Sequence, residues 1–154
     1  MSRHWLFKSE PDAYSFEQLR IDGTTPWSGV RNYQARNFMM EMKAGDLGLF
    51  YHSSIPEPAA VGIVKVARTA YPDFTALERG GEYYDPRSTD AKPIWMMVDV
   101  AYVEPLAHPV TLARMREDRR LAAMPLLQRG QRLSVQPIEA HEWKIILALA
   151  KKPG

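Results

Sequence analysis

Residues 61–67 read Val61-Gly62-Ile63-Val64-Lys65-Val66-Ala67, a short run that is apolar on both faces at its centre. Such a run is typical of a strand buried inside a sheet. Strand-like segments lie on both sides of it: residues 47–52 precede it, and residues 94–103, rich in Val, Ile, Trp and Tyr, follow it. Trp5-Leu6-Phe7 predicts a short buried first strand. Residues 133–138 alternate with period two, and Pro137 places that strand at an edge or a bulge.

Helical signals are interspersed among these strands. Ser15 to Gln18 has the form of a capping box and predicts a helix over residues 16–21. Apolar residues at helical spacing predict helices from Asn32 to about Gly45, from Thr111 to about Met124, and over residues 140–150. The inward positions of all these segments form the predicted core: Trp5, Phe38, Met39, Val64, Val98, Trp143, Ile146 and Leu147. Because no regular βαβ rhythm occurs, we predict an α+β fold whose largely antiparallel sheet curls into a small barrel with helices outside.

Composition places the chain among ordinary globular proteins. It has 154 residues, 45% of them hydrophobic, which favours one domain with a single substantial core. Lys and Arg number 20 against 18 Asp and Glu, a net charge of +2 that permits nucleic-acid binding only if positive charge gathers on one face. No apolar stretch is long enough for a transmembrane helix, and the apolar run near residue 5 is too short for a signal peptide. We therefore expect a cytoplasmic protein without membrane association.

Several chemistries lack sequence support. The chain has no cysteine, which excludes disulfides, thiolate metal sites and thiol catalysis. No glycine-rich phosphate loop and no Gly-x-Ser-x-Gly nucleophile motif occurs. The four histidines are scattered at positions 4, 52, 108 and 141, and no carboxylate pair stands out. We predict no metal, no cofactor and no catalytic residue.

The most unusual segment is Trp27-Ser28-Gly29-Val30-Arg31-Asn32-Tyr33-Gln34-Ala35-Arg36-Asn37. An aromatic ring stacks on flat heterocycles, and amide side chains read the donor and acceptor pattern of a base edge. Arg side chains and the N–H groups at a helix start bind phosphate or carbonyl oxygens. This combination suits a nucleobase. Two structural interpretations stay open: Asn32 as a helix cap and Trp27 as a packing residue of the core.

Motifs of a known family occur along the chain in family order, namely residues 5–11 (Trp-Leu-Phe-Lys-Ser-Glu-Pro), 27–37, Gly45-Asp46, 50–53 (Phe-Tyr-His-Ser), 83–86 (Tyr-Tyr-Asp-Pro), 95–100 (Trp-Met-Met-Val-Asp-Val) and 130–137 (Gly-Gln-Arg-Leu-Ser-Val-Gln-Pro). They give the chain a resemblance to the EVE-domain family over residues 3–148. It implies a single EVE domain over residues 1–154 with a PUA-like fold, a small mixed β-barrel with flanking helices. It also implies kinship with YTH domains, which hold a methylated adenine in an aromatic cage, and a partner that is DNA or RNA carrying a modified base.

The resemblance also assigns a base-binding pocket. Lys8 and Ser9 match the strand-end pair of the related YTH pocket, and Trp27 matches its first cage Trp. The second cage Trp has no counterpart, because the corresponding loop reads Glu82-Tyr83-Tyr84-Asp85-Pro86; Tyr84 is predicted as a wall, and Trp95 as either a cage or a core residue. The complete predicted pocket comprises Lys8, Ser9, Trp27, Gly29, Val30, Asn32, Gln34, His52, Tyr84, Trp95, Ser134, Gln136 and Pro137.

Phosphate contacts are predicted at Arg31 and Arg36, which flank the pocket motif. The basic cluster over residues 114–120 is interrupted by Glu117 and Asp118 and is predicted to be a solvated helix face. The long polar segment 78–93 is predicted to be a functional or partly disordered loop.

Three functions are compatible with this sequence. The first is a non-catalytic module that reads a modified base. The second is an enzyme acting on a nucleobase or small heterocycle, with Ser9 or His52 in the chemistry. The third is a protein-interaction module with a vestigial pocket. The polar residues gathered near Trp27 favour the first. The identity of the base, the choice between DNA and RNA, and the oligomeric state stay open.

Overall fold

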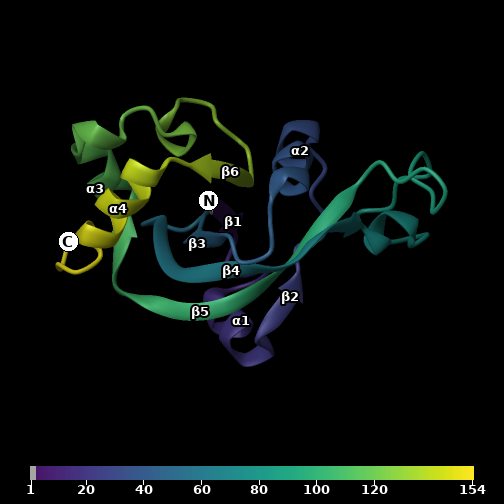
Figure 1. Cartoon of the computed structure of the whole chain (residues 1–154), viewed down its shortest axis with the longest axis horizontal. Coiled ribbons are helices and arrows are strands. Elements are labelled where there is room, and N and C mark those ends of the chain that lie inside the picture. The colour runs from purple at the N-terminus through teal and green to yellow at the C-terminus, as the bar shows by residue number, and fades with distance from the viewer. Residues whose placement is uncertain (1–2) are drawn as a thin grey trace.

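The computed structural model describes residues 3–154 as one curved sheet with helices on both faces (Figure 1). The α+β class is confirmed. The elements in chain order are β1 (His4–Ser9), α1 (Phe16–Asp22), β2 (Thr24–Pro26), α2 (Tyr33–Glu41), β3 (Leu47–His52), β4 (Ala59–Pro72), the 3-10 turn η1 (Phe74–Leu77), β5 (Met96–Thr111), α3 (Leu112–Glu117), the 3-10 turns η2 (Arg119–Leu121) and η3 (Pro125–Leu127), β6 (Val135–Ile138) and α4 (Ala140–Leu149).

The six strands are ordered β2-β5-β4-β3-β1-β6. Only β1 and β3 run parallel; the other neighbours are antiparallel. The register between the long strands β4 and β5 shifts at four places, and such irregularities bend and twist a sheet. The sheet is therefore strongly curved while β2 and β6 remain its two edges. Pro137 lies in the edge strand β6, as predicted.

Apolar side chains fill both sides of the sheet. Trp5 and Phe7 project into a cluster with Phe50, Val64 and Val98, whereas Leu6 projects into a second cluster beneath α3 and α4. This explains why β1 reads as a continuous apolar run instead of an alternating one. Of the predicted core, Trp5, Met39, Val64, Val98, Trp143 and Ile146 are buried, and Phe38 and Leu147 are half-buried.

Element boundaries differ from the prediction where a side chain ends a helix. The Ser15 hydroxyl accepts the Gln18 N–H and starts α1 as predicted. The helix predicted up to Met124 stops at Glu117, because extended Asp118 breaks it and its carboxylate caps η2 through the Arg120 N–H. Likewise α2 ends at Glu41, since Met42 is extended.

The segment Asp73–Trp95 leaves the end of β4, forms η1 and a series of turns, and returns into β5; we call it the distal lobe (Figure 1). It lies at the opposite end of the molecule from α3 and α4. Apart from η1, the lobe has neither helix nor strand, consistent with the polar loop predicted for residues 78–93.

Candidate functional site

A cavity of about 630 Å³ opens where the C-terminal end of β1 meets the segment 27–31 and the tip of the distal lobe. Its volume lies within the roughly 300–1,000 Å³ that is usual for ligand pockets. Residues from five separate chain segments line it. Among the predicted pocket residues, the lining includes Lys8, Ser9, Trp27, Gly29, Val30 and Ser134.

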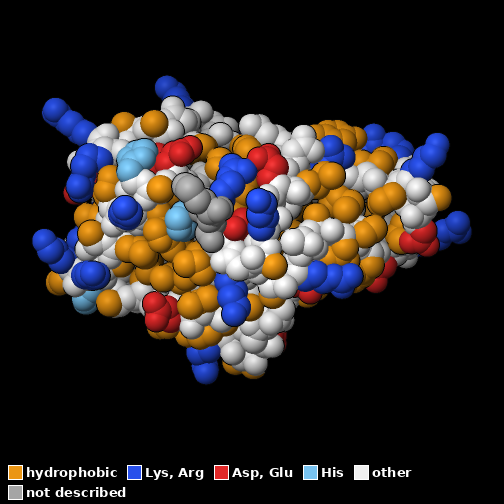
Figure 2. Space-filling view, viewed as in Figure 1, with side chains coloured by type: hydrophobic (Ala, Val, Ile, Leu, Met, Phe, Trp, Pro, Cys, Tyr) orange, Lys and Arg blue, Asp and Glu red, His pale blue; other side chains and the backbone are white. Residues whose placement is uncertain are grey.

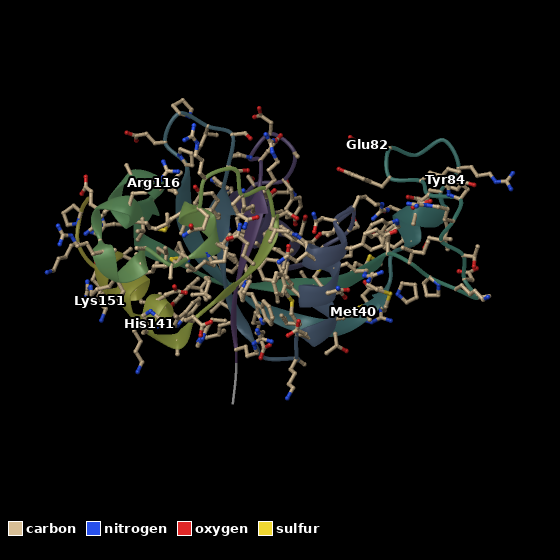
Figure 3. All side chains as sticks on the ribbon, turned by 90° about the horizontal axis from the view of Figure 1, so that it is seen from above. Met40, Glu82, Tyr84, Arg116, His141 and Lys151 are labelled. Atoms are coloured by element: carbon tan, nitrogen blue, oxygen red, sulfur yellow. The ribbon has the colours of Figure 1, made fainter. Side chains whose placement is uncertain are left out.

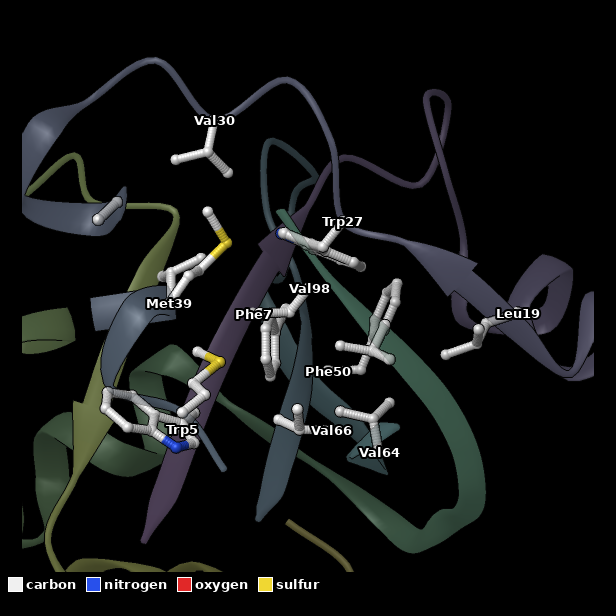
Figure 4. Close-up of a cluster of buried hydrophobic side chains, with 14 of the residues drawn as sticks. Trp5, Phe7, Leu19, Trp27, Val30, Met39, Phe50, Val64, Val66 and Val98 are labelled. Atoms are coloured by element: carbon white, nitrogen blue, oxygen red, sulfur yellow. The ribbon is translucent and has the colours of Figure 1, made fainter. Parts of the chain in front are cut away.

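Trp27 forms the inner surface of this cavity and also belongs to the core. Its ring meets Phe7 edge-on at 5.2 Å between centroids and Phe50 at 5.6 Å, and only 8% of the residue is exposed (Figure 4). Its backbone N–H donates to the Val98 carbonyl at 2.7 Å. The two interpretations of Trp27 are therefore compatible: the packing that buries the ring also holds it rigidly at the cavity.

Gly29 and Tyr83 form the wall beside Trp27. Gly29 has φ of +80°, and a β-carbon there would lie 2.9 Å from Tyr83 Cζ, so only glycine allows the ring to pack this closely. Tyr83 and Glu82 line the cavity, whereas Tyr84 lies farther out on the same loop (Figure 3). The pocket wall predicted at Tyr84 is therefore formed by Tyr83 instead. The prediction missed by one residue because sequence periodicity does not fix the direction of side chains in a loop.

The segment 27–31 is attached to the distal lobe by Asp73, which sequence reasoning did not identify. Its buried carboxylate accepts the Gly29 N–H at 2.8 Å and the Arg31 Nη1–H at 3.1 Å. The Arg31 guanidinium also donates to the Thr75 hydroxyl and to the Tyr83 carbonyl, the latter at 2.7 Å. Arg31 is therefore a positioning residue that holds Tyr83 against the pocket, and these contacts do not support its predicted phosphate role. The one sequence signal was Pro72-Asp73, a turn-forming pair.

Trp95 lies outside the cavity, so the structure favours the core alternative for it. The residue is 3% exposed, its indole N–H donates to Asp85 at 2.7 Å, and Tyr33 stacks on it at 4.8 Å. Hydrogen bonds from Arg87, and then from Trp95, hold the pKa of the Asp85 carboxyl below its usual range. This group of contacts orders the distal lobe internally.

The polar residues at the cavity come from β1 and from the segment before β6. The Ser9 hydroxyl donates to the Tyr14 carbonyl at 2.6 Å, and the Lys8 N–H donates to the Ser134 carbonyl at 2.8 Å. The Lys8 ammonium has no hydrogen bond or ion pair among residues 3–154, and burial lowers its pKa. Lys8 is thus a lining residue whose cation has no internal partner in the described part of the chain.

Besides Tyr84 and Trp95, five predicted pocket residues do not line the cavity, and four of these five have a clear place in the fold. Asn32 caps α2 by accepting the Ala35 N–H at 3.0 Å, the structural alternative left open for it. The His52 Nε2 accepts the Phe16 N–H at 3.1 Å. Gln136 is buried and donates to the Leu133 carbonyl, and Pro137 pairs with Trp5 in the β1–β6 register. Gln34 is exposed on α2.

Arg36, the second predicted phosphate residue, also has internal partners. It donates to the Ile94 carbonyl at 3.0 Å and to the Asn37 side chain at 2.7 Å, and its guanidinium covers the Tyr33 ring. Most of its donor groups are therefore used within the fold.

Two further searches concern metals and membranes. Within residues 3–154, no three His, Asp or Glu side chains are grouped so as to bind a metal ion. No helix in the same range has the length and apolar character needed to cross a bilayer.

Residues 3–149 match the family model described as "EVE domain". The chain belongs to the EVE-domain family. Thymocyte nuclear protein 1 of Homo sapiens is 40% identical over 171 residues, covering 99% of this EVE domain chain and 76% of the relative. The resemblance seen in the motifs is thus confirmed.

Solved structures agree with this assignment. A Pseudomonas syringae protein superposes with a TM-score of 0.91 at 46% identity, covering 96% of this chain and 99% of that one. Human THYN1 protein, solved in complex with DNA containing 5-methylcytosine, gives 0.89 at 39% identity, covering 98% and 99%. A YTH domain of Zygosaccharomyces rouxii MRB1 gives 0.57 at 18% identity, covering 99% and 89%, which shows a shared fold. The PUA-like architecture is confirmed, and the YTH domain shares this fold.

The comparisons also correct the expected location. The relatives from human and mouse are named thymocyte nuclear protein 1, a name that points to the nucleus. The cytoplasmic expectation is therefore wrong.

Proposed function

We propose that this EVE domain is a non-catalytic module that binds DNA or RNA carrying a modified base and takes that base, flipped out of its strand, into the cavity at Trp27. The observation that carries the proposal is an open cavity lined by a rigidly packed aromatic side chain, Trp27, together with a second ring, Tyr83, beside it. A family member of the same fold, human THYN1 protein, has been solved with 5-methylcytosine-containing DNA.

The energetics of such a site are balanced. Flipping a base out of its stack costs a few kcal/mol, and stacking on an aromatic side chain returns roughly 1–3 kcal/mol. Hydrogen bonds from Lys8 and Ser134 to the base edge supply the remainder. Burying a methyl group adds about 0.8 kcal/mol, only a few-fold in affinity. Strong discrimination between the modified and the unmodified base therefore requires a penalty for the unmodified base. Such a penalty arises if the space for the methyl group is then left empty or filled by water.

The local hydrogen bonds support binding without catalysis. The Ser9 hydroxyl is already donating to the Tyr14 carbonyl, and the Nε2 of His52 is already accepting a backbone N–H. Neither group is paired with the other as a nucleophile is with its base. We propose that residues 1–154 act as a single EVE domain, with base contacts from Lys8, Ser9, Trp27, Gly29, Val30, Tyr83 and Ser134.

The test compares two buried tryptophans. Trp27 borders the cavity, whereas Trp143 is equally buried beneath the other face of the sheet. We expect Trp27→Leu to lower the ratio of affinities for matched 5-methylcytosine and cytosine oligonucleotides, and Trp143→Leu to leave that ratio unchanged. Circular dichroism confirms that each variant is folded. An unchanged ratio in folded Trp27→Leu would refute the stacking role.

The catalytic alternative is tested on the same complexes. Oligonucleotides are recovered after prolonged incubation with the protein, and their masses are measured by mass spectrometry. We expect their masses to be unchanged. A product of altered mass that Trp27→Leu fails to form would replace the binding proposal with an enzymatic one.

A further inference from the structure

Positive charge is concentrated at one end of the molecule. Residues 107–154 contain nine Lys and Arg against four Asp and Glu, a net charge of +5, whereas residues 1–106 contain eleven against fourteen, a net charge of −3. The segment 111–154 forms α3, η2, η3, β6 and α4, which we call the basic end. Figure 2 shows Lys and Arg side chains projecting around this end, at the left.

The acidic residues of the basic end are mostly engaged within it. Asp118 pairs with Arg120 at 2.6 Å, and the buried Glu142 accepts the Glu139 N–H at 2.8 Å. By contrast, Arg116 and Arg119 are exposed and have no ion pair among residues 3–154. The basic cluster is therefore solvent-exposed, as predicted, and two of its cations are available to a ligand.

These cations project from a rigid base. Met115 of α3, Leu121 of η2 and Ile146 of α4 are buried in one apolar cluster. Arg116 follows Met115 directly, and Arg119 lies two residues before Leu121. The backbone of Arg116 and Arg119 is therefore fixed by packing. Binding of a polyanion then needs to order only the two side chains, which keeps the entropic cost of binding low.

Strand β1 connects the pocket with the face of the sheet that the basic end covers. Side chains alternate along β1, so Lys8, which lines the cavity, projects from the same face as Leu6, which packs beneath α3 and α4. Lys8 pairs in register with Tyr51 on β3. Tyr51 is buried in the same apolar cluster as Met115, the residue before Arg116. In Figure 3 Arg116 lies at the left of the molecule, and Glu82, which lines the cavity, lies at the right on the distal lobe.

The opposite side of the pocket has the opposite charge. The distal lobe, residues 73–95, contains three Lys and Arg against five Asp and Glu, a net charge of −2. One of these acids, Glu82, lines the cavity itself. A phosphate backbone leaving the pocket in this direction meets like charge, whereas toward the basic end it meets cations.

We propose that the nucleic acid bound at the pocket extends asymmetrically from it, over the basic end, with Arg116 and Arg119 contacting its phosphates. This inference rests on the proposed function, since it needs a base in the pocket as the fixed point. It assigns the phosphate contacts to α3 and η2 in place of Arg31 and Arg36.

The experiment uses two DNA duplexes of equal length that carry one 5-methylcytosine near either the 5′ or the 3′ end, so that the flanking DNA extends to one side only. The variant is Arg116→Ala/Arg119→Ala. The matched control, Lys65→Ala/Arg79→Ala, removes the same charge from exposed positions without ion pairs on β4 and the distal lobe. Affinities are measured over a range of salt concentrations.

We expect the wild-type protein to prefer one duplex, and Arg116→Ala/Arg119→Ala to abolish this preference. We also expect that variant to flatten the slope of log affinity against log salt by about 1.8, the contribution of two phosphates on duplex DNA. The control variant Lys65→Ala/Arg79→Ala should keep the wild-type preference for one duplex and the wild-type slope of log affinity against log salt. Equal wild-type affinities for the two duplexes, or equal slopes for the two variants, would overturn the inference.

A separate readout distinguishes this failure from failure of the proposed function. The ratio of affinities for methylated and unmethylated duplexes depends on the pocket, and phosphate contacts do not affect it. A normal ratio with unaltered slopes refutes only the path over the basic end. A wild-type ratio of one for every modification tested refutes the proposed function together with the path that rests on it.

Discussion

Replacing Gly29 by Ala tests whether Tyr83 is a working wall of the pocket. Gly29 has φ of +80°, and an added β-carbon would lie 2.9 Å from Tyr83 Cζ. Gly80 offers a matched control, because its φ is +81° and a β-carbon there has no heavy atom within 4 Å. Both substitutions place an L-residue in the left-handed region, at a cost of about 1–2 kcal/mol of unfolding free energy. Only Gly29→Ala also displaces the tyrosine ring.

The expected results separate stability from binding. Tyr83 is 40% exposed and its ring moves without disrupting the core, so the two variants should lose similar unfolding free energy in urea denaturation. Displacing one stacking surface costs roughly 1–3 kcal/mol of binding free energy, or about 5- to 150-fold in affinity. We therefore expect Gly29→Ala, and not Gly80→Ala, to weaken binding of a modified oligonucleotide measured by fluorescence anisotropy.

A double variant shows whether the effect passes through Tyr83. If the ring is the cause, adding Gly29→Ala to Tyr83→Ala weakens binding no more than adding Gly80→Ala does. A further loss specific to Gly29→Ala in the Tyr83→Ala background would mean that the new methyl group itself obstructs the cavity. Equal affinities of the single variants Gly29→Ala and Gly80→Ala would refute the role of Tyr83 altogether.

Two further predictions concern stability. Ile146→Ala should cost roughly 2–5 kcal/mol of unfolding free energy, because Ile146 is fully buried in the cluster beneath α4. The folded variant should keep its preference for the modified base. Unaltered melting with complete loss of binding would contradict the core assignment. Burial lowers the pKa of His52 below 6.5, so the unfolded chain binds more protons as the pH falls through 6.5 and the unfolding free energy decreases. In the His52→Gln variant, the decrease in unfolding free energy between pH 8 and pH 5 should be smaller than in the wild-type protein. Identical dependence of the unfolding free energy on pH in the two proteins would contradict this role of His52.

Local sequence rules predicted the parts of the fold that local chemistry controls. Ser15 starts α1 because its hydroxyl satisfies an N–H that the helix itself leaves free. The apolar runs at residues 5–7 and 47–52 became buried strands because their leucine and aromatic side chains cover both faces of a sheet. Helix ends were less predictable, since Asp118 acts as a cap for η2 only once the neighbouring turn has formed.

The sequence by itself determined the family, the α+β class, most of the core and the importance of the segment around Trp27, because these depend on residue order and periodicity. Only the tertiary structure decided which side chains share the cavity. Arg31 is held by Asp73, 42 positions away, and Gly29 contacts Tyr83 and not Tyr84. Asn32, which has the right chemistry for a base edge, is used to cap α2. The physical reason is that a pocket depends on how segments remote in sequence lie relative to one another. The curvature of the sheet and buried hydrogen bonds set these positions, and sequence periodicity does not encode them.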